Sequence, residues 1–92
     1  MKPIKVLLVD DEERFLSSLS LLLARRGCQV ITAGSGQEAL EKLAGQEVDV
    51  MVLDIKMPGL DGLATFKEAK KLSPLVEIIM LTGHATMNNA LE

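Results

Sequence analysis

Residues 48–62 read Val-Asp-Val-Met-Val-Leu-Asp-Ile-Lys-Met-Pro-Gly-Leu-Asp-Gly, a run that becomes continuously apolar, ends at an acid and leads into turn residues. A continuous apolar run is typical of a strand that is covered on both faces of a sheet. The Pro and Gly residues beyond Asp54 disfavour regular structure and predict a loop over residues 56–62. The stretch therefore predicts a buried strand over residues 48–53 whose carboxyl end presents a carboxylate.

The rest of the chain alternates short β-rich runs with amphipathic stretches. In those stretches the apolar residues recur at helical spacing. The expected elements are strand 4–9, helix 12–26, strand 29–33, helix 35–45, strand 48–53, helix 63–72 and strand 77–81. Strands that alternate with helices in this way imply right-handed crossovers and a parallel sheet. The sequence therefore predicts one small α/β domain with a doubly wound parallel sheet.

Composition excludes several classes of protein. The 92 residues carry a net charge of −3 and only two aromatic residues, which argues against direct contact with nucleic acid. No apolar run approaches the ~20 residues needed to span a bilayer, so no membrane partner is expected. The single cysteine, Cys28, cannot form an internal disulfide, which is typical of a reducing compartment. We expect a cytoplasmic protein.

Three of the four expected strands end at an oxygen-bearing side chain. Asp10 and Asp11 follow the first strand, Asp54 follows the third, and Thr82 follows the fourth. Ligands of open α/β sheets bind outside the carboxyl ends of the strands. If the first and third strands are neighbours, three carboxylates gather there and need a cation, for which Mg²⁺ is the natural choice. Such a site can offer one carboxylate as a nucleophile to a phosphoryl group, with Thr82 as a hydrogen-bond donor.

Three segments resemble the receiver (phosphoacceptor) domain of bacterial two-component response regulators. They cover residues 6–12, 52–62 and 79–84, and the middle one follows the specific pattern apolar-Asp-x-x-Met-Pro-x-x-Asp-Gly. The resemblance extends over residues 2–92. It implies a flavodoxin-like sheet with the strand order 2-1-3-4 and a further fifth strand.

The resemblance also implies a role for each site residue. Asp54 would accept a phosphoryl group from a phosphohistidine of a partner sensor histidine kinase. Asp11, Asp54 and the backbone carbonyl of Lys56 would bind Mg²⁺ directly, and Asp10 would act through a metal-bound water. Thr82 would be the switch hydroxyl that moves toward the phosphoryl group. Such a domain catalyses its own phosphorylation and dephosphorylation and does not turn over a diffusible substrate.

The family's fifth strand, its lysine and its fifth helix have no counterpart in residues 1–92. We therefore expect a C-terminally incomplete receiver domain whose fourth strand, residues 77–81, forms an apolar edge. Such an edge can pair with another chain, so we expect self-association through this strand or through exchanged segments. The alternative function is a non-transducing interaction or assembly module that keeps the metal pocket.

Plainer interpretations compete for some of these residues. The strand-end acids could simply cap helices, and for Asp61, just before Gly62, capping is the favoured interpretation. A Mg²⁺-dependent phosphatase of the haloacid dehalogenase type also uses an aspartyl nucleophile after its first strand. That family needs Asp-x-Asp, whereas the position two beyond Asp10 is Glu12.

Overall fold

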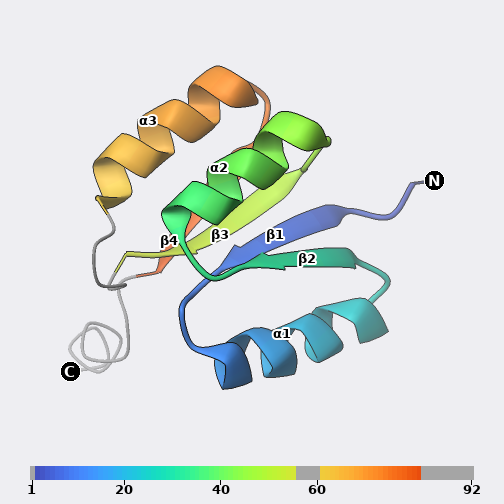
Figure 1. Cartoon of the computed structure of the whole chain (residues 1–92). Coiled ribbons are helices and arrows are strands. Elements are labelled where there is room, and N and C mark those ends of the chain that lie inside the picture. The colour runs from blue at the N-terminus through green and yellow to red at the C-terminus, as the bar shows by residue number, and fades with distance from the viewer. Residues whose placement is uncertain (1, 56–60, 82–92) are drawn as a thin grey trace, which may run out of the picture.

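A parallel four-stranded sheet with helices on both faces forms the part of the protein that the structure describes. In this computed structural model, which describes residues 2–55 and 61–81, the elements are β1 (Lys5–Val9), α1 (Glu13–Arg25), β2 (Gln29–Ala33), α2 (Gly36–Gly45), β3 (Val50–Asp54), α3 (Gly62–Leu72) and β4 (Glu77–Leu81). The strand order is β2-β1-β3-β4, and every pair is parallel. Helices α2 and α3 cover one face of the sheet, and α1 covers the other (Figure 1). The predicted doubly wound sheet with order 2-1-3-4 is confirmed.

Element boundaries agree closely with the sequence pattern, and the clearest difference lies at β3. The strand starts at Val50 instead of residue 48, and it includes Asp54 as its last residue. Just before the strand, the Asp49 carboxylate accepts a hydrogen bond from the backbone amide of Lys5, 2.8 Å away. Asp49 therefore flanks β3 and ties its amino end to β1.

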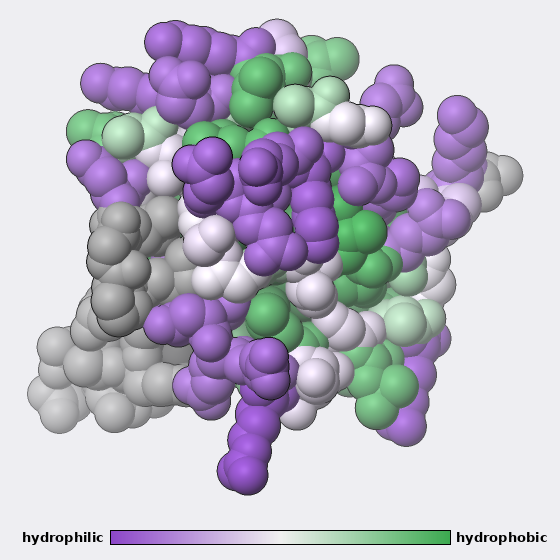
Figure 2. Space-filling view, in the orientation of Figure 1, coloured by the Kyte–Doolittle hydropathy of each residue, from purple (hydrophilic) through white to green (hydrophobic). Residues whose placement is uncertain are grey.

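Two apolar layers hold the helices against the sheet. Alternate residues of β1 point to opposite faces, so Leu7 and Val9 join the layer under α2 and α3, while Val6 and Leu8 join the layer over α1. All four side chains are buried, which explains why β1 is apolar without interruption. The surface of α2 and α3 in Figure 2 is largely hydrophilic, as expected for helices with one buried side.

Local signals set the helix ends. The Ser35 hydroxyl accepts a hydrogen bond from the Glu38 amide at 3.1 Å and caps α2. Asp61 caps α3 in the same way, because its Oδ1 accepts from the Ala64 amide at 3.0 Å. Beyond α1, Gly27 has a φ of 91°, a conformation that side chains with a Cβ rarely adopt. The capping role predicted for Asp61 is therefore confirmed.

Strand β4 pairs only with β3 among the described residues, so the sheet has one edge there. Ile79 is 50% exposed and Met80 is 38% exposed on this strand. The predicted apolar edge is thus present in the described part of the sheet.

Candidate functional site

The site begins with two carboxylates at the carboxyl ends of adjacent strands. In the pairing of β1 with β3, Val9 lies opposite Leu53. Asp10 is the residue after Val9, and Asp54 is the residue after Leu53 and the last residue of β3. Because the two strands are parallel neighbours, both acids emerge at the same edge of the sheet. The condition on which the predicted site depends, adjacency of the first and third strands, is met.

Asp10 is held by two hydrogen bonds. Its backbone amide donates to the Ala33 carbonyl on β2 at 3.1 Å, and its Oδ1 accepts from the Glu12 amide at 2.9 Å. The residue is only 6% exposed. Glu12, not Asp11, occupies the N-cap position of α1, and its own side chain makes no capping hydrogen bond. Asp11 therefore does not cap α1, and Asp10 accepts only the amide of the N-cap residue.

The electrostatics of Asp10 indicate crowded carboxylates. Burial raises the pKa of Asp10 above its ordinary value of 3.8, and the neighbouring carboxyl groups of Asp54 and Asp11 raise it further. The Glu12 amide opposes this shift by stabilising the carboxylate. Asp10 thus interacts with Asp11 and Asp54, the two acids that were expected to lie close to it.

A pocket of about 580 Å³ opens beside Asp10 between α1, the end of β2 and the start of α2. The carboxylates of Asp10, Asp11, Glu13 and Glu38 line it together with three hydroxyl-bearing side chains. Its wall is therefore anionic and rich in oxygen, which suits cationic ligands.

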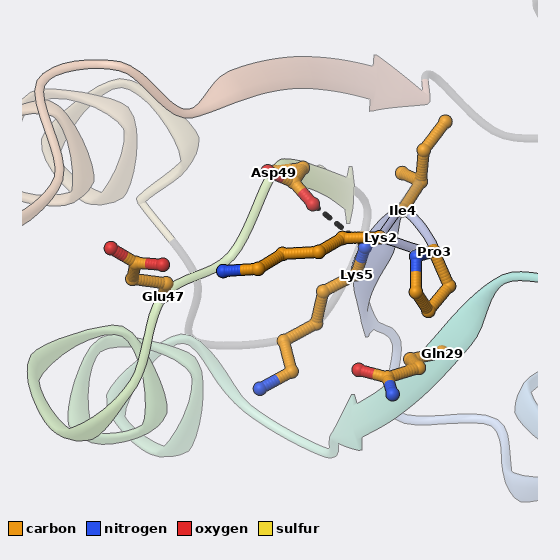
Figure 3. A pocket seen from close by; sticks show the side chains of 7 residues that line it. All are labelled: Lys2, Pro3, Ile4, Lys5, Gln29, Glu47 and Asp49. Atoms are coloured by element: carbon orange, nitrogen blue, oxygen red, sulfur yellow. Dashed lines mark hydrogen bonds between the residues drawn. The ribbon is translucent and has the colours of Figure 1, made fainter.

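A second pocket, of about 440 Å³, lies at the opposite end of the sheet and is shown in Figure 3. Its wall combines the cationic residues Lys2 and Lys5 with the acidic residues Glu47 and Asp49. The dashed line in Figure 3 marks the bond by which Asp49 accepts the Lys5 amide. None of the predicted site residues lies there, so this pocket is not the candidate site.

Two of the five predicted site residues, Lys56 and Thr82, lie outside the described residues. In residues 2–55 and 61–81, no group of three or more His, Cys, Asp or Glu side chains is arranged to hold a metal ion by itself. The ligand set that the resemblance implies has two direct carboxylates and the Lys56 carbonyl. The donor chemistry fits Mg²⁺, since a buried carboxylate contacts two further acids and all of these donors are oxygens.

One residue of the pocket wall, Glu38, was not among the predicted site residues. Glu38 completes the Ser35 capping sequence, but its carboxylate turns toward the end of β2. There it accepts the Gly34 amide at 2.8 Å and pairs with Lys42 at 3.2 Å. The spacing of Glu38 and Lys42, four residues apart on a helix, was the available signal.

Comparison with known proteins decides the family. The family described as "Response regulator receiver domain" matches residues 6–92. The chain belongs to this family. The predicted resemblance is therefore confirmed, and the chain is a receiver domain of two-component response regulators.

Several transcriptional regulators contain a similar receiver domain. The chain is 39% identical over 89 residues to the transcriptional regulatory protein GlrR of Escherichia coli (strain K12), a match that covers 97% of this chain and 20% of GlrR. It is 42% identical over 79 residues to the alkaline phosphatase synthesis transcriptional regulatory protein PhoP of Bacillus subtilis (strain 168), covering 86% of this chain and 33% of PhoP. The chain therefore spans a minor part of the length of these relatives.

Solved structures agree on the fold. A CheY-like response regulator receiver domain from Methanospirillum hungatei JF-1 superposes with a TM-score of 0.84 at 31% identity, covering 97% of this chain and 71% of that one. The response regulator protein TrrA from Thermotoga maritima, in complex with Mg²⁺-BeF, gives a TM-score of 0.80 at 35% identity, covering 96% and 76%. In the described segments of this receiver domain, no helix has the length and apolar character to cross a membrane.

Proposed function

We propose that this receiver domain accepts a phosphoryl group from a sensor histidine kinase onto Asp54 in the presence of Mg²⁺, and that it switches through Thr82. The observation that supports this proposal best is the meeting of Asp54 with the buried Asp10 at the ends of two adjacent strands. A carboxylate at this edge of an open α/β sheet is accessible to a ligand and is held by a rigid scaffold.

The proposed step is an in-line transfer. A carboxylate oxygen of Asp54 attacks phosphorus, a P–O bond forms, and the P–N bond to the kinase imidazole breaks. The imidazole nitrogen leaves with the electron pair of that bond and takes up a proton. Asp10 contributes by orienting the end of β1, because its main-chain and side-chain bonds fix it beside Asp54. The Thr82 hydroxyl would donate a hydrogen bond to a phosphoryl oxygen.

Mg²⁺ would be held by Asp11, Asp54 and the carbonyl of Lys56, with Asp10 acting through a bound water. When bound, the ion neutralises negative charge that builds on the transferred group. The oxygen donors around Asp10 support this assignment. The complex of the similar TrrA with Mg²⁺-BeF supports it further.

Intact-mass spectrometry tests the proposed function. The purified chain, incubated with acetyl phosphate and MgCl₂, should gain the mass of one phosphoryl group. Excess EDTA should prevent the gain, and mild alkali should reverse it because an acyl phosphate hydrolyses readily. A chain that gains no mass in Mg²⁺, or gains it equally in EDTA, would contradict the proposal.

The raised pKa of Asp10 predicts how stability depends on pH without metal. The folded state holds the Asp10 proton more tightly than the unfolded state does. The free energy of unfolding therefore falls as the pH rises from below 3.8 through the pKa of Asp10 in the folded state. Asp10→Asn removes that loss, and its side-chain oxygen can still accept the Glu12 amide. In EDTA near neutral pH, the variant should therefore unfold at a higher temperature than the wild type.

Two controls sharpen this prediction. Well below pH 3.8 the difference should vanish, because Asp10 is then protonated in both states. Millimolar Mg²⁺ should stabilise the wild type more than Asp10→Asn, since the ion relieves carboxylate repulsion. Thermal unfolding followed by circular dichroism compares the two proteins under all three conditions. If Asp10→Asn is less stable than the wild type in EDTA near neutral pH, the ionised Asp10 carboxylate does not destabilise the metal-free fold, and the prediction is wrong.

The proposal extends to the regulatory output of the protein and to its location in the cell. Relatives such as GlrR and PhoP are transcriptional regulatory proteins, and transcription regulation is the corresponding output for this receiver domain. Direct contact with DNA would lie outside this segment, whose net charge is −3. The free thiol of Cys28 is compatible with a reducing cytoplasm.

A second candidate function, self-association as an assembly module, rests on the edge of β4. Within the described sheet this strand has one neighbour, and its exposed Ile79 and Met80 offer an apolar surface for another copy. Light scattering at micromolar concentrations should then find dimers or larger species, and Ile79→Lys should shift them toward monomer. A stable wild-type monomer over this range would eliminate this candidate.

A further inference from the structure

The end of β2 carries no acid, yet it is tied to α2 by a network of polar contacts. Glu38 accepts the Gly34 amide through Oε1 at 2.8 Å, and its Oε2 lies 3.2 Å from the Lys42 ammonium. The Lys42 ammonium also donates a hydrogen bond to the backbone carbonyl of Thr32. One ion pair on α2 therefore contacts the backbone on both sides of Ala33.

Ala33 is the residue that connects this network to the phosphoacceptor site. Its carbonyl accepts the backbone amide of Asp10 at 3.1 Å. Its own methyl group is buried and has no polar atom, so it cannot fix the position of that carbonyl by itself. Besides the ladder with β1, in which Val9 lies opposite Ala33, the side-chain bonds to the backbone of Thr32 and Gly34 hold this segment.

The Glu38 carboxylate of the network stays charged under physiological conditions. The Gly34 amide lowers the pKa of Glu38, and the Lys42 ammonium lowers it further, so the carboxylate stays ionised near neutral pH. The amino end of α2 is capped separately by the Ser35 hydroxyl. Loss of the ion pair would therefore free the end of β2 without removing the cap of the helix.

We propose that Glu38 and Lys42 are positioning residues of the receiver site: they hold the end of β2 so that the Ala33 carbonyl fixes Asp10 beside Asp54. The inference rests on the proposed function in so far as it concerns phosphoryl uptake. Neither residue touches the transferred group. Both act on the backbone amide of Asp10 through the backbone of β2. The acids Asp11 and Asp54 interact instead with the Asp10 carboxyl group.

Two variants remove the network while they preserve most of the packing. Lys42→Met keeps an unbranched side chain and loses both ammonium contacts, and Glu38→Ala loses the acceptor of the Gly34 amide. Hydrogen exchange measured by NMR on the metal-free protein should show the Asp10 amide exchanging about 10-fold faster in either variant, as expected for loss of a charged hydrogen bond. The rate constant of phosphoryl uptake from acetyl phosphate should fall about 3- to 10-fold.

Rescue and a matched control separate positioning from a general loss of stability. Lys42→Arg keeps a cationic donor and should restore exchange at the Asp10 amide to near the wild-type rate. The exposed Lys71–Glu68 pair, also 3.2 Å long, joins two residues of α3 to each other, so Lys71→Met should change neither readout. Thermal unfolding of each variant shows whether faster exchange comes from global opening.

Unchanged exchange at the Asp10 amide in both Lys42→Met and Glu38→Ala would overturn the inference, as would an equal effect of Lys71→Met. A wild-type chain that takes up no phosphate would count against the proposed function alone. Exchange at the Asp10 amide would still decide the role of the network in that case.

Discussion

Asp54→Asn should abolish phosphoryl uptake from acetyl phosphate, with a fall in the rate constant of at least about 100-fold. Asparagine has nearly the same size and shape, but its amide oxygen is not a nucleophile toward phosphorus at neutral pH. The variant should fold as well as the wild type, because it removes one of the charges that crowd Asp10. Intact-mass spectrometry over a time course provides the rate.

Asp61→Asn is the matched control for this substitution. Asp61 caps α3 through its Oδ1, and asparagine is an equally good cap, so the fold is preserved. The control makes the same chemical change in the same chain, and it should take up phosphate at the wild-type rate. Full phosphorylation of Asp54→Asn, at a site mapped to another residue, would remove Asp54 from the proposed role.

Leu7→Ala should destabilise the fold by about 2–5 kcal/mol. Leu7 is fully buried, with an exposure of 0%, and lies on β1 between Ile31 of β2 and Met51 of β3. Truncation leaves a cavity at the centre of the sheet, where rigid neighbours on two strands cannot close it. For a domain of this size, the unfolding midpoint should fall by about 8 °C or more.

Leu75→Ala tests whether burial, and not the loss of a leucine as such, causes this effect. Leu75 precedes β4 and is 91% exposed. Its truncation should change the free energy of unfolding by no more than about 0.5 kcal/mol. Thermal or urea unfolding compares the two variants directly. Equal losses of stability would contradict the assignment of β1 to the centre of the core.

The agreement between sequence and structure is best where a local pattern has one physical explanation. The strands at residues 29–33 and 77–81 have the predicted bounds, because apolar runs of β-rich residues stand between clear turn signals. Asp61 before Gly62 was correctly predicted as a helix cap. The start of β3 was predicted two residues early, since Val48 is buried like a strand residue although it precedes the strand.

The candidate site, too, could be predicted from the sequence only in part. The residues Asp10, Asp11 and Asp54 were predicted from their positions after expected strands. Glu38 was not predicted as a residue of the site, because the partner of its carboxylate is the Gly34 backbone, whose position depends on the end of β2. A backbone amide has no signature in the sequence. The contact could therefore be found only in three dimensions.

The sequence by itself determined the alternation of strands and helices, the apolar faces and the acid at the end of each chemically important strand. These features follow from residue periodicity and turn chemistry, which act over a few neighbouring positions. The tertiary structure determined which strands are neighbours, and hence that Asp10 meets Asp54 while its amide is bound to Ala33. Periodicity indicates which side of a strand is buried, but the pairing of strands depends on contacts between residues far apart in the chain.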